Sequence, residues 1–480
     1  MDIELQQQQQ QQIRYDRQIR LWGDEGQKTI QKAKICVFGS CALAAEILKS
    51  LVLAGVGYFH IIDNKIVKTS DLGQNFFLDV DSVGKLRGEC LVKLLTELNP
   101  SVHGQHSPVP FGEFSKHEMF MLLNFSLVIG TNMLANEASK LDKFLFENNI
   151  PFLFVKSVGM LGYLRLSFNE HIIWNNRSVN DCYDLRIDSP FPELLKLANE
   201  TDLNSMTHEQ HSHTPYVPSN VSKVLDDPKI NSSCNVSKYS KSSTFNLFWL
   251  FCSALNKFIS KYGHMPISGQ LPDMTSDSKR YAQLLGIYRE DFSTAHSLME
   301  TSKEFSEEHL PKITLEQCKN FCKNASKIAV QYGTSLSSEF NGNNLKSLLQ
   351  KIEPPRLDEL PPVVDPLTWY ILLRVVDRFQ EVNGRVPKEE GDLREMKRIL
   401  GELLGETKDS ELIKKQEQLF PDQIIVEICR FGASELHVIS AIIGGVAAQE
   451  AIKLCTNQYI PVDNCLIYDG NSQNATSFKN

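Results

Sequence analysis

Short apolar runs and amphipathic stretches alternate through the first third of the chain. An apolar run at Ile35–Phe38 is followed by apolar positions at helical spacing over residues 43–52 and by a second run at Tyr58–Ile62. The pattern continues with one amphipathic stretch and three more short runs, at Gly88–Leu98, Leu127–Gly130, Phe152–Val155 and Leu161–Phe168. Strands that alternate with helices predict a parallel, doubly wound α/β sheet, so we expect residues 13–168 to form the first part of a Rossmann-like domain.

One amphipathic helix is predicted ahead of this sheet. Residues 1–12 form a low-complexity lead that contains seven consecutive glutamines and supplies little apolar surface to bury. Beyond the lead, apolar residues recur at helical spacing at Tyr15, Ile19 and Trp22. They give the helix one apolar stripe, with Arg17 on another face, and the stripe indicates that the helix docks against another part of a folded molecule.

The composition changes after the sheet pattern ends. The stretch 175–243 is polar and rich in Asn, Ser, Asp and Pro, whereas mainly helical patterns follow in 245–349 and 366–404. Near the end of the chain, a glycine-rich apolar helix and a further strand resume the alternation of strands and helices seen in the first domain. We therefore expect a largely α-helical insertion at 169–425, followed by a return to the first domain at 426–480.

Charge and cysteine usage exclude several classes of function. The 480 residues include 50 Lys and Arg against 58 Asp and Glu, a net charge of -8, so nucleic acid is not expected to be a partner. The longest apolar run, Leu247–Leu255, is shorter than the roughly 20 residues that span a bilayer, and no targeting signal precedes it, so we expect no membrane association and a cytoplasmic and nuclear location. Eleven scattered cysteines without a C-x-x-C pair predict neither a disulfide framework nor a four-cysteine zinc site.

The turn after the first predicted strand decides whether a nucleotide can bind. A phosphate-binding loop needs glycines because the backbone must approach the anion closely and turn into a helix. The stretch Gly39–Ala44 keeps only the first glycine of a G-x-G-x-x-G motif, and Cys41 places a side chain where phosphates would press. Asp63, 24 residues beyond Gly39, is placed either to bind a ribose hydroxyl or to cap a loop. We expect no nucleotide binding by this chain alone.

Motifs along nearly the whole chain resemble those of ubiquitin-like activating enzymes. The general ones are Tyr15-Asp-Arg-Gln-Ile-Arg-Leu-Trp-Gly23, Leu48-Lys-Ser-Leu-Val-Leu-Ala-Gly-Val-Gly57, Ile61-Ile-Asp63, Phe76-Phe77 and Gly444-Gly-Val-Ala-Ala-Gln-Glu-Ala-Ile-Lys453. Others resemble the regulatory, non-catalytic subunits of neddylation activating enzymes in particular, and these are Asp184–Leu194, His211–Pro215, Leu271–Met274 with Tyr281, and Cys429–His437. The resemblance implies a degenerate, ThiF-type adenylation fold.

The resemblance also implies an incomplete catalytic half-site. The adenylating half of such an enzyme carries an Asn-Arg-Gln triad, a lysine on the following helix and a magnesium-binding aspartate. The corresponding residues here are Gly73, Gln74 and Asn75 for the triad, Arg87 for the lysine and Asn132 for the aspartate. The loss of the triad arginine removes a bidentate phosphate partner, and Asn in place of Asp removes the charge that Mg²⁺ requires. No cofactor is therefore expected in this chain, and ATP and Mg²⁺ are expected in a partner subunit.

A heterodimer follows from the same resemblance. It pairs this chain with a catalytic subunit that adenylates the ubiquitin-like modifier of neddylation, forms its thioester and serves a downstream conjugating enzyme. The implied interface comprises Tyr15, Arg17, Ile19, Trp22, Gly444 and Gly445. Arg17 is expected to reach the terminal phosphates of the partner's ATP in trans. The chain itself is expected to hold no catalytic residue.

The remaining thiols and imidazoles carry no sign of a catalytic or metal site. Five cysteines fit core positions, and these are Cys36, Cys90, Cys252, Cys429 and Cys455. Four others have no His or Arg neighbour in the sequence that would favour the thiolate, and these are Cys182, Cys234, Cys318 and Cys322. His211 and His213 alternate in polar sequence without a third partner at a suitable spacing, so no metal site is predicted.

One departure from the family's pattern leaves alternatives open. After Pro215 the resembling subunits continue with a long helical stretch, which is absent here, so the helical insertion is expected to be shortened at that point. A self-sufficient, nucleotide-dependent Rossmann enzyme that uses Asp63 is one alternative function. An interaction scaffold derived from the same fold is the other.

Overall fold

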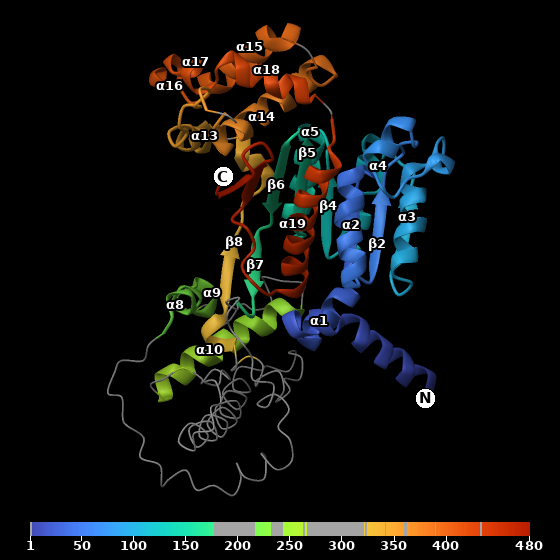
Figure 1. Cartoon of the computed structure of the whole chain (residues 1–480). Coiled ribbons are helices and arrows are strands. Elements are labelled where there is room, and N and C mark those ends of the chain that lie inside the picture. The colour runs from blue at the N-terminus through green and yellow to red at the C-terminus, as the bar shows by residue number, and fades with distance from the viewer. Residues whose placement is uncertain are drawn as a thin grey trace, which may run out of the picture. The chain divides into compact units, whose positions relative to one another are not determined.

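A computed structural model describes residues 2–176, 217–231, 243–262, 265, 321, 324–340, 342–359, 362–388, 390–432 and 434–480 (Figure 1). The chain divides into two compact units. The first comprises Met1–His171, Tyr332–Thr456 and Pro461–Asn480, and the second comprises Ile172–Gln331 and Asn457–Ile460. The motifs at 184–194, 211–215 and 271–281, and the cysteines Cys182, Cys234, Cys318 and Cys322, lie outside the described residues.

An eight-stranded sheet forms the centre of the first unit. Its strands are β1 (Lys34–Phe38), β2 (Tyr58–Ile62), β3 (His103–Ser107), β4 (Leu127–Thr131), β5 (Phe152–Val158), β6 (Leu161–Ser167), β9 (Cys465–Asp469) and β10 (Asn474–Phe478). They lie in the order β10-β9-β6-β5-β4-β1-β2-β3. The five strands from β5 to β3 run parallel, and β6, β9 and β10 add antiparallel neighbours. The predicted α/β, doubly wound fold is confirmed.

Helices cover the sheet as the alternating pattern predicts. They are α2 (Ala42–Ala54), α3 (Arg87–Leu98), α4 (Phe111–His117), α5 (Ala135–Glu147) and α19 (His437–Thr456), with short 3₁₀ turns at Thr69–Gly73, Val80–Ser82 and Met119–Asn124. The helices α2 and α19 pack side by side on the sheet (Figure 1). By length and composition α19 could cross a membrane, but 56% of its most apolar window is buried inside the protein, as in the core helix of a folded domain.

The N-terminal helix α1 (Asp2–Lys32) includes the glutamine lead and is broken at Gly23, where φ is 72° and ψ is 168°. Tyr15 is almost fully buried, and its hydroxyl accepts a hydrogen bond of 2.8 Å from the Asn99 side chain. Gly55 ends α2 in a left-handed conformation, and a Cβ there would lie 2.6 Å from the Tyr15 hydroxyl oxygen. Glycine at this position therefore lets α1 dock closely on the end of α2.

A helical layer adjoins the sheet within the first unit. Its elements are α13 (Gly342–Leu349), α14 (Pro366–Asn383), α15 (Leu393–Gly405), α16 (Ser410–Lys414), α17 (Gln416–Leu419) and α18 (Asp422–Phe431), with 3₁₀ turns at Leu336–Phe340 and Glu390–Asp392. Asp365 caps the start of α14, and Gly384 ends it in a left-handed conformation, which glycine adopts at little cost. Apolar residues of α14, α15 and α18 share one core with the sheet.

A buried polar cluster fastens this helical layer to strand β6. The side chain of Arg165 is fully buried, and its Nε lies 3.4 Å from the Glu339 carboxylate. The hydroxyls of Tyr163 and Tyr370 donate to the same carboxylate over 2.7 and 2.5 Å. The prediction that one insertion runs from 169 to 425 is therefore corrected. The helices after Tyr332 belong to the same unit as the sheet, and the second unit comprises only Ile172–Gln331 and Asn457–Ile460.

The second unit contains helices around an aromatic core. A two-stranded sheet of β7 (Glu170–Ile173) and β8 (Ala329–Tyr332) leads into it. Its described helices are α8 (Ser219–Leu225), α9 (Pro228–Asn231) and α10 (Ser243–Tyr262), with a 3₁₀ turn at Ala325–Lys327. Apolar residues of α8 and α10, among them Val221, Phe248 and Phe251, form the core. The helical pattern predicted from residue 245 onward is confirmed by α10, whereas α8 and α9 lie in the polar stretch 175–243, for which no helix was predicted.

Candidate functional site

The candidate site is the loop between β1 and α2. Strand β1 lies between β2 and β4, so chain connections leave the sheet in opposite directions at this point, where Rossmann-like domains bind their ligands. Gly39 opens the loop with φ of +100°, and a Cβ there would meet the Thr131 hydroxyl at 2.5 Å. The surviving glycine of the motif is thus required for contact between the β1 loop and strand β4.

Cys41 occupies the mouth of this loop. It stands immediately before α2 and gives the helix no side-chain cap. Its Sγ lies 3.6 Å from the Thr131 hydroxyl and 3.7 Å from the Asn132 amide nitrogen. Burial, reinforced by the nearby Glu435 carboxylate, raises the pKa of the Cys41 thiol to about 12. The thiol therefore fills space in the loop and is not a nucleophile at neutral pH.

Glu435 belongs to this site, although the motif Cys429–His437 that contains it gave no sign of that place. Its carboxylate accepts hydrogen bonds from the backbone N–H groups of Leu43 at 2.8 Å and Ala42 at 3.3 Å, in the first turn of α2. Glu435 lies almost 400 residues beyond this helix in the chain. No local pattern connects the two, and only the packing of α19 beside α2 brings them together.

Asp63 is engaged by neighbours in the chain. It is 7% exposed, accepts a short hydrogen bond from the Ser40 hydroxyl, and accepts one of 3.3 Å from the backbone N–H of Lys65. Arg87 lies 3.5 Å from the Asp63 carboxylate and 3.4 Å from that of Asp71. Of the two interpretations left open for Asp63, the structure favours the loop-capping one.

The other degenerate positions of the half-site are Gly73, Gln74, Asn75 and Asn132. Gly73 ends a 3₁₀ turn with open space around it, and Gln74 follows it directly. Asn75 is buried and accepts a hydrogen bond of 3.1 Å from the backbone N–H of Phe77. Asn132 accepts one of 2.9 Å from the Ser157 N–H and donates to Glu435 over 3.3 Å. The side-chain oxygens of Asn75 and Asn132 are therefore engaged by backbone N–H groups of this chain rather than by a phosphate or a cation.

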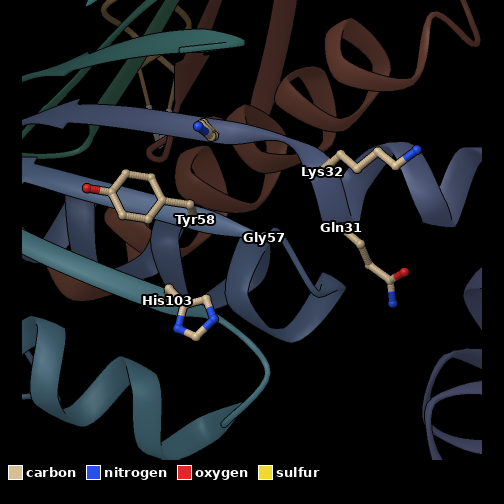
Figure 2. Close-up of a pocket in the computed structure, with 6 residues that line it drawn as sticks. Gln31, Lys32, Gly57, Tyr58 and His103 are labelled. Carbon is tan, nitrogen blue, oxygen red and sulfur yellow. The ribbon is translucent and has the colours of Figure 1, made fainter. Parts of the chain in front are cut away.

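The described segments contain no metal cluster, and a hollow in them lies away from the β1 loop. No group of three or more His, Cys, Asp or Glu side chains in them is arranged to hold a metal ion. An open hollow of about 340 Å³ is lined by Gln31, Lys32, Lys34, Gly57, Tyr58 and His103 (Figure 2). It lies at the amino ends of β1, β2 and β3, the edge opposite to that used by Rossmann nucleotides.

Comparison with known proteins identifies the family. The model of the ThiF family matches residues 15–480. The NEDD8-activating enzyme E1 regulatory subunit of Caenorhabditis elegans is 38% identical, over 97% of this chain and 98% of that protein. The subunits of the same name in Xenopus laevis and Drosophila melanogaster are 32% and 31% identical, each over 97% of this chain and 98% and 97% of their own length. The chain belongs to the ThiF family.

Within the ThiF family, the chain groups with the regulatory subunits of NEDD8-activating enzymes, as its motifs implied. The alignment with the Caenorhabditis elegans subunit spans 535 positions, whereas this chain has 480 residues, so at least 55 aligned positions have no counterpart here. That difference agrees with a shortened chain. The place of the shortening, after Pro215, stays a prediction because residues 177–216 lie outside the described part.

The described thiols of this ThiF family member are poorly suited to thioester chemistry. Burial raises the pKa of Cys36, Cys252 and Cys465, and it raises those of Cys429 and Cys455 to about 11 and about 12. A nucleophilic cysteine needs the opposite shift. The core positions predicted for Cys36, Cys252 and Cys429 are confirmed. Cys90 lies half-buried on a helix, which corrects its prediction, and Cys455 is a half-buried residue whose thiol is enclosed.

The predicted interface residues of α1 differ in how far they are exposed. Tyr15 and Trp22 are 1% and 4% exposed, so they anchor α1 to its own chain and present no surface to a partner, which corrects their assignment. Ile19 is half-buried. Arg17 is exposed, and its side chain forms no ion pair or hydrogen bond with any residue in the described segments. Arg20 pairs instead with Asp16, at 3.0 Å.

The two glycines of α19 play different roles. A Cβ on Gly444 would lie 3.0 Å from the Glu46 Cβ and 3.3 Å from the Ile47 backbone nitrogen, so this glycine allows α19 to approach α2. A Cβ on Gly445 would meet no atom within 4 Å. Gly445 is therefore not packed against its own chain, and its place in an interface with a partner stays a prediction. Gly445 lies on an outward face of α19 with Val438 and Ile442.

Replacement of Gly444 by Leu is expected to lower the free energy of unfolding by about 1–3 kcal/mol, because the added side chain overpacks the α2 contact. The measurement is urea denaturation of the isolated chain. Gly445→Leu is the matched control in the same helix, and it should change stability by no more than about 1 kcal/mol, in the stabilising direction, because Leu favours helix more than Gly. Equal losses in the two variants would contradict the assigned packing.

Proposed function

We propose that this chain is the non-catalytic subunit of a heterodimeric NEDD8-activating enzyme. The catalytic subunit binds ATP and Mg²⁺, adenylates the modifier and forms its thioester, after which a conjugating enzyme receives the modifier. We also propose a cytoplasmic and nuclear location. The observation that carries the proposal is the Glu435 carboxylate at the start of α2, where an adenylating subunit needs phosphate.

Two further features of the loop support the proposal. Asn132, at the position of a magnesium-binding aspartate, has no charge to offer a cation and is held by Ser157 and Glu435. Arg87 and Asp63 form an ion pair with each other. A self-sufficient Rossmann enzyme would need Asp63 available for a ribose, so that alternative is disfavoured.

The purified chain is expected to catalyse no modifier-dependent exchange of pyrophosphate into ATP. The reason is that no described residue is free to bind the triphosphate and its magnesium ion in the β1 loop. The assembled complex with the catalytic subunit should catalyse exchange under the same conditions and serves as the positive control. Exchange by the chain alone would refute a non-catalytic role, and failure to assemble with the catalytic subunit would favour an interaction scaffold.

The geometry of α1 supports a contribution of this chain to its partner's site. Tyr15 and Trp22 fix the helix, and Arg17 projects from another face into solvent. A guanidinium held on an anchored helix can donate paired hydrogen bonds to phosphate oxygens of a second subunit. We propose that Arg17 acts in this way on ATP bound by the catalytic subunit.

A further inference from the structure

Four donors converge on the carboxylate of Glu435. The backbone N–H groups of Leu43 and Ala42 lie 2.8 and 3.3 Å from its two oxygens. The Asn132 amide and the Ser440 hydroxyl donate to it over 3.3 and 3.5 Å. The first turn of α2 has no acidic residue and the residue before it provides no cap. Glu435 therefore supplies the negative charge that this end of the helix attracts.

The backbone around Glu435 fixes its position independently of these side-chain contacts. The N–H of Gly159 donates to the Ser434 carbonyl over 2.8 Å, and Gly159 and Glu435 form a parallel bridge. Gly159 has φ of +54°, and a Cβ there would lie 2.4 Å from the ring of Phe431. Only glycine fits this approach. The segment before α19 is thus fastened to the turn between β5 and β6, and its backbone delivers the carboxylate to the loop.

We propose that Glu435 is an internal anion that occupies the phosphate position of the degenerate loop. In Rossmann-like domains, a phosphate binds the backbone N–H groups at the start of the helix after the first strand. In this chain a carboxylate already satisfies those groups, and its charge repels a phosphate that approaches the same place. Two features therefore exclude phosphate from the loop: the missing glycines, and the Glu435 carboxylate that already occupies the anion position. This closure is a property of the chain by itself, whether or not a partner is bound.

The test is the thermal stability of the full chain in inorganic phosphate, at an ionic strength kept constant with sodium chloride. Glu435→Ala leaves the N–H groups of α2 open to dissolved anions, so its Tm should fall in chloride and recover by about 2 to 4 °C as phosphate fills the site. The unchanged protein should respond no more to phosphate than to chloride. Glu427→Ala is the matched control, because it removes a carboxylate that pairs with Arg430 on the surface, and it should show no phosphate response.

A second variant decides the question if Glu435→Ala does not fold. Glu435→Gln keeps the shape of the side chain and removes its charge, so its Tm should fall and phosphate should not restore it, because the amide still fills the position. An unchanged Tm in Glu435→Gln, or equal phosphate responses in the unchanged protein and Glu435→Ala, would overturn the proposal. This experiment measures stability and not adenylation. A result that overturns the role of Glu435 can therefore be told apart from a result that overturns the proposed function in the pyrophosphate-exchange experiment.

Discussion

Arg17→Ala is expected to slow adenylate formation by the assembled heterodimer by about 10- to 1000-fold, the range for the loss of one preorganised electrostatic contact. Arg17 is exposed on a helix whose buried Tyr15 and Trp22 hold it in place, so its guanidinium is available to the terminal phosphates of ATP in another subunit. The charge would stabilise the departing pyrophosphate. The measurement is the single-turnover rate of modifier adenylation at saturating ATP.

Arg20→Ala is the matched control for this experiment. Arg20 stands on the same helix but pairs with Asp16 within its own chain, and both side chains are largely exposed. Its loss should leave the adenylation rate unchanged and alter stability little. Arg17→Lys should recover only part of the rate, because an ammonium keeps the charge without the planar fork. If the Arg17→Ala complex stays assembled and adenylates the modifier as fast as the unchanged complex, this chain has a structural role only.

Glu339→Gln is expected to lower the free energy of unfolding by about 3–5 kcal/mol, the usual cost of removing one partner from a buried ion pair. The fully buried Arg165 would lose its counter-charge, although its hydrogen bonds to the carbonyls of Thr334 and Ser335 would remain. The variant should therefore loosen the helical layer from strand β6. Urea denaturation, followed by the near-ultraviolet signal of Trp369 in α14, measures the effect.

A surface ion pair provides the comparison for Glu339. Glu406 pairs with Arg378 at 2.6 Å, and about a third of each side chain is exposed. Water screens such a pair, so Glu406→Gln should change stability far less than Glu339→Gln. If the two variants unfold at the same urea concentration, the buried cluster does not hold the helical layer to the sheet.

The sequence predicts those elements of the fold whose signal is local. The runs around β1, β2, β4 and β5 are apolar because both faces of these strands are covered. Strand β3 was missed because it lies at the edge of the sheet and its residues are polar. The extent of the insertion was misjudged because the helices after Tyr332 join the sheet through contacts such as that of Glu339 with Arg165.

The candidate site was likewise predictable only in part. Cys41 and Asn132 lie together, as expected from a resemblance that gives them the phosphate and magnesium positions of one site, and Asp63 lies beside Arg87. The charge that fills the loop was not predictable, because Glu435 lies in the distant motif Cys429–His437 and nothing in that motif connects it with the β1 loop. Gly444 and Gly445 are identical in the sequence, and only the direction in which each faces separates the packed position from the open one.

The pairing of β6 with β9 has a consequence for how the protein is made. These neighbouring strands, Leu161–Ser167 and Cys465–Asp469, are separated by about 300 residues of chain. At ribosomal speeds of about 5–20 residues per second, β6 emerges roughly 15–60 s before the strand that covers its edge. During that interval a bare strand edge is open to pairing with other nascent chains. Folding of the first unit therefore has to wait for the end of synthesis, and its yield in the cell should depend on chaperones that shield the waiting sheet.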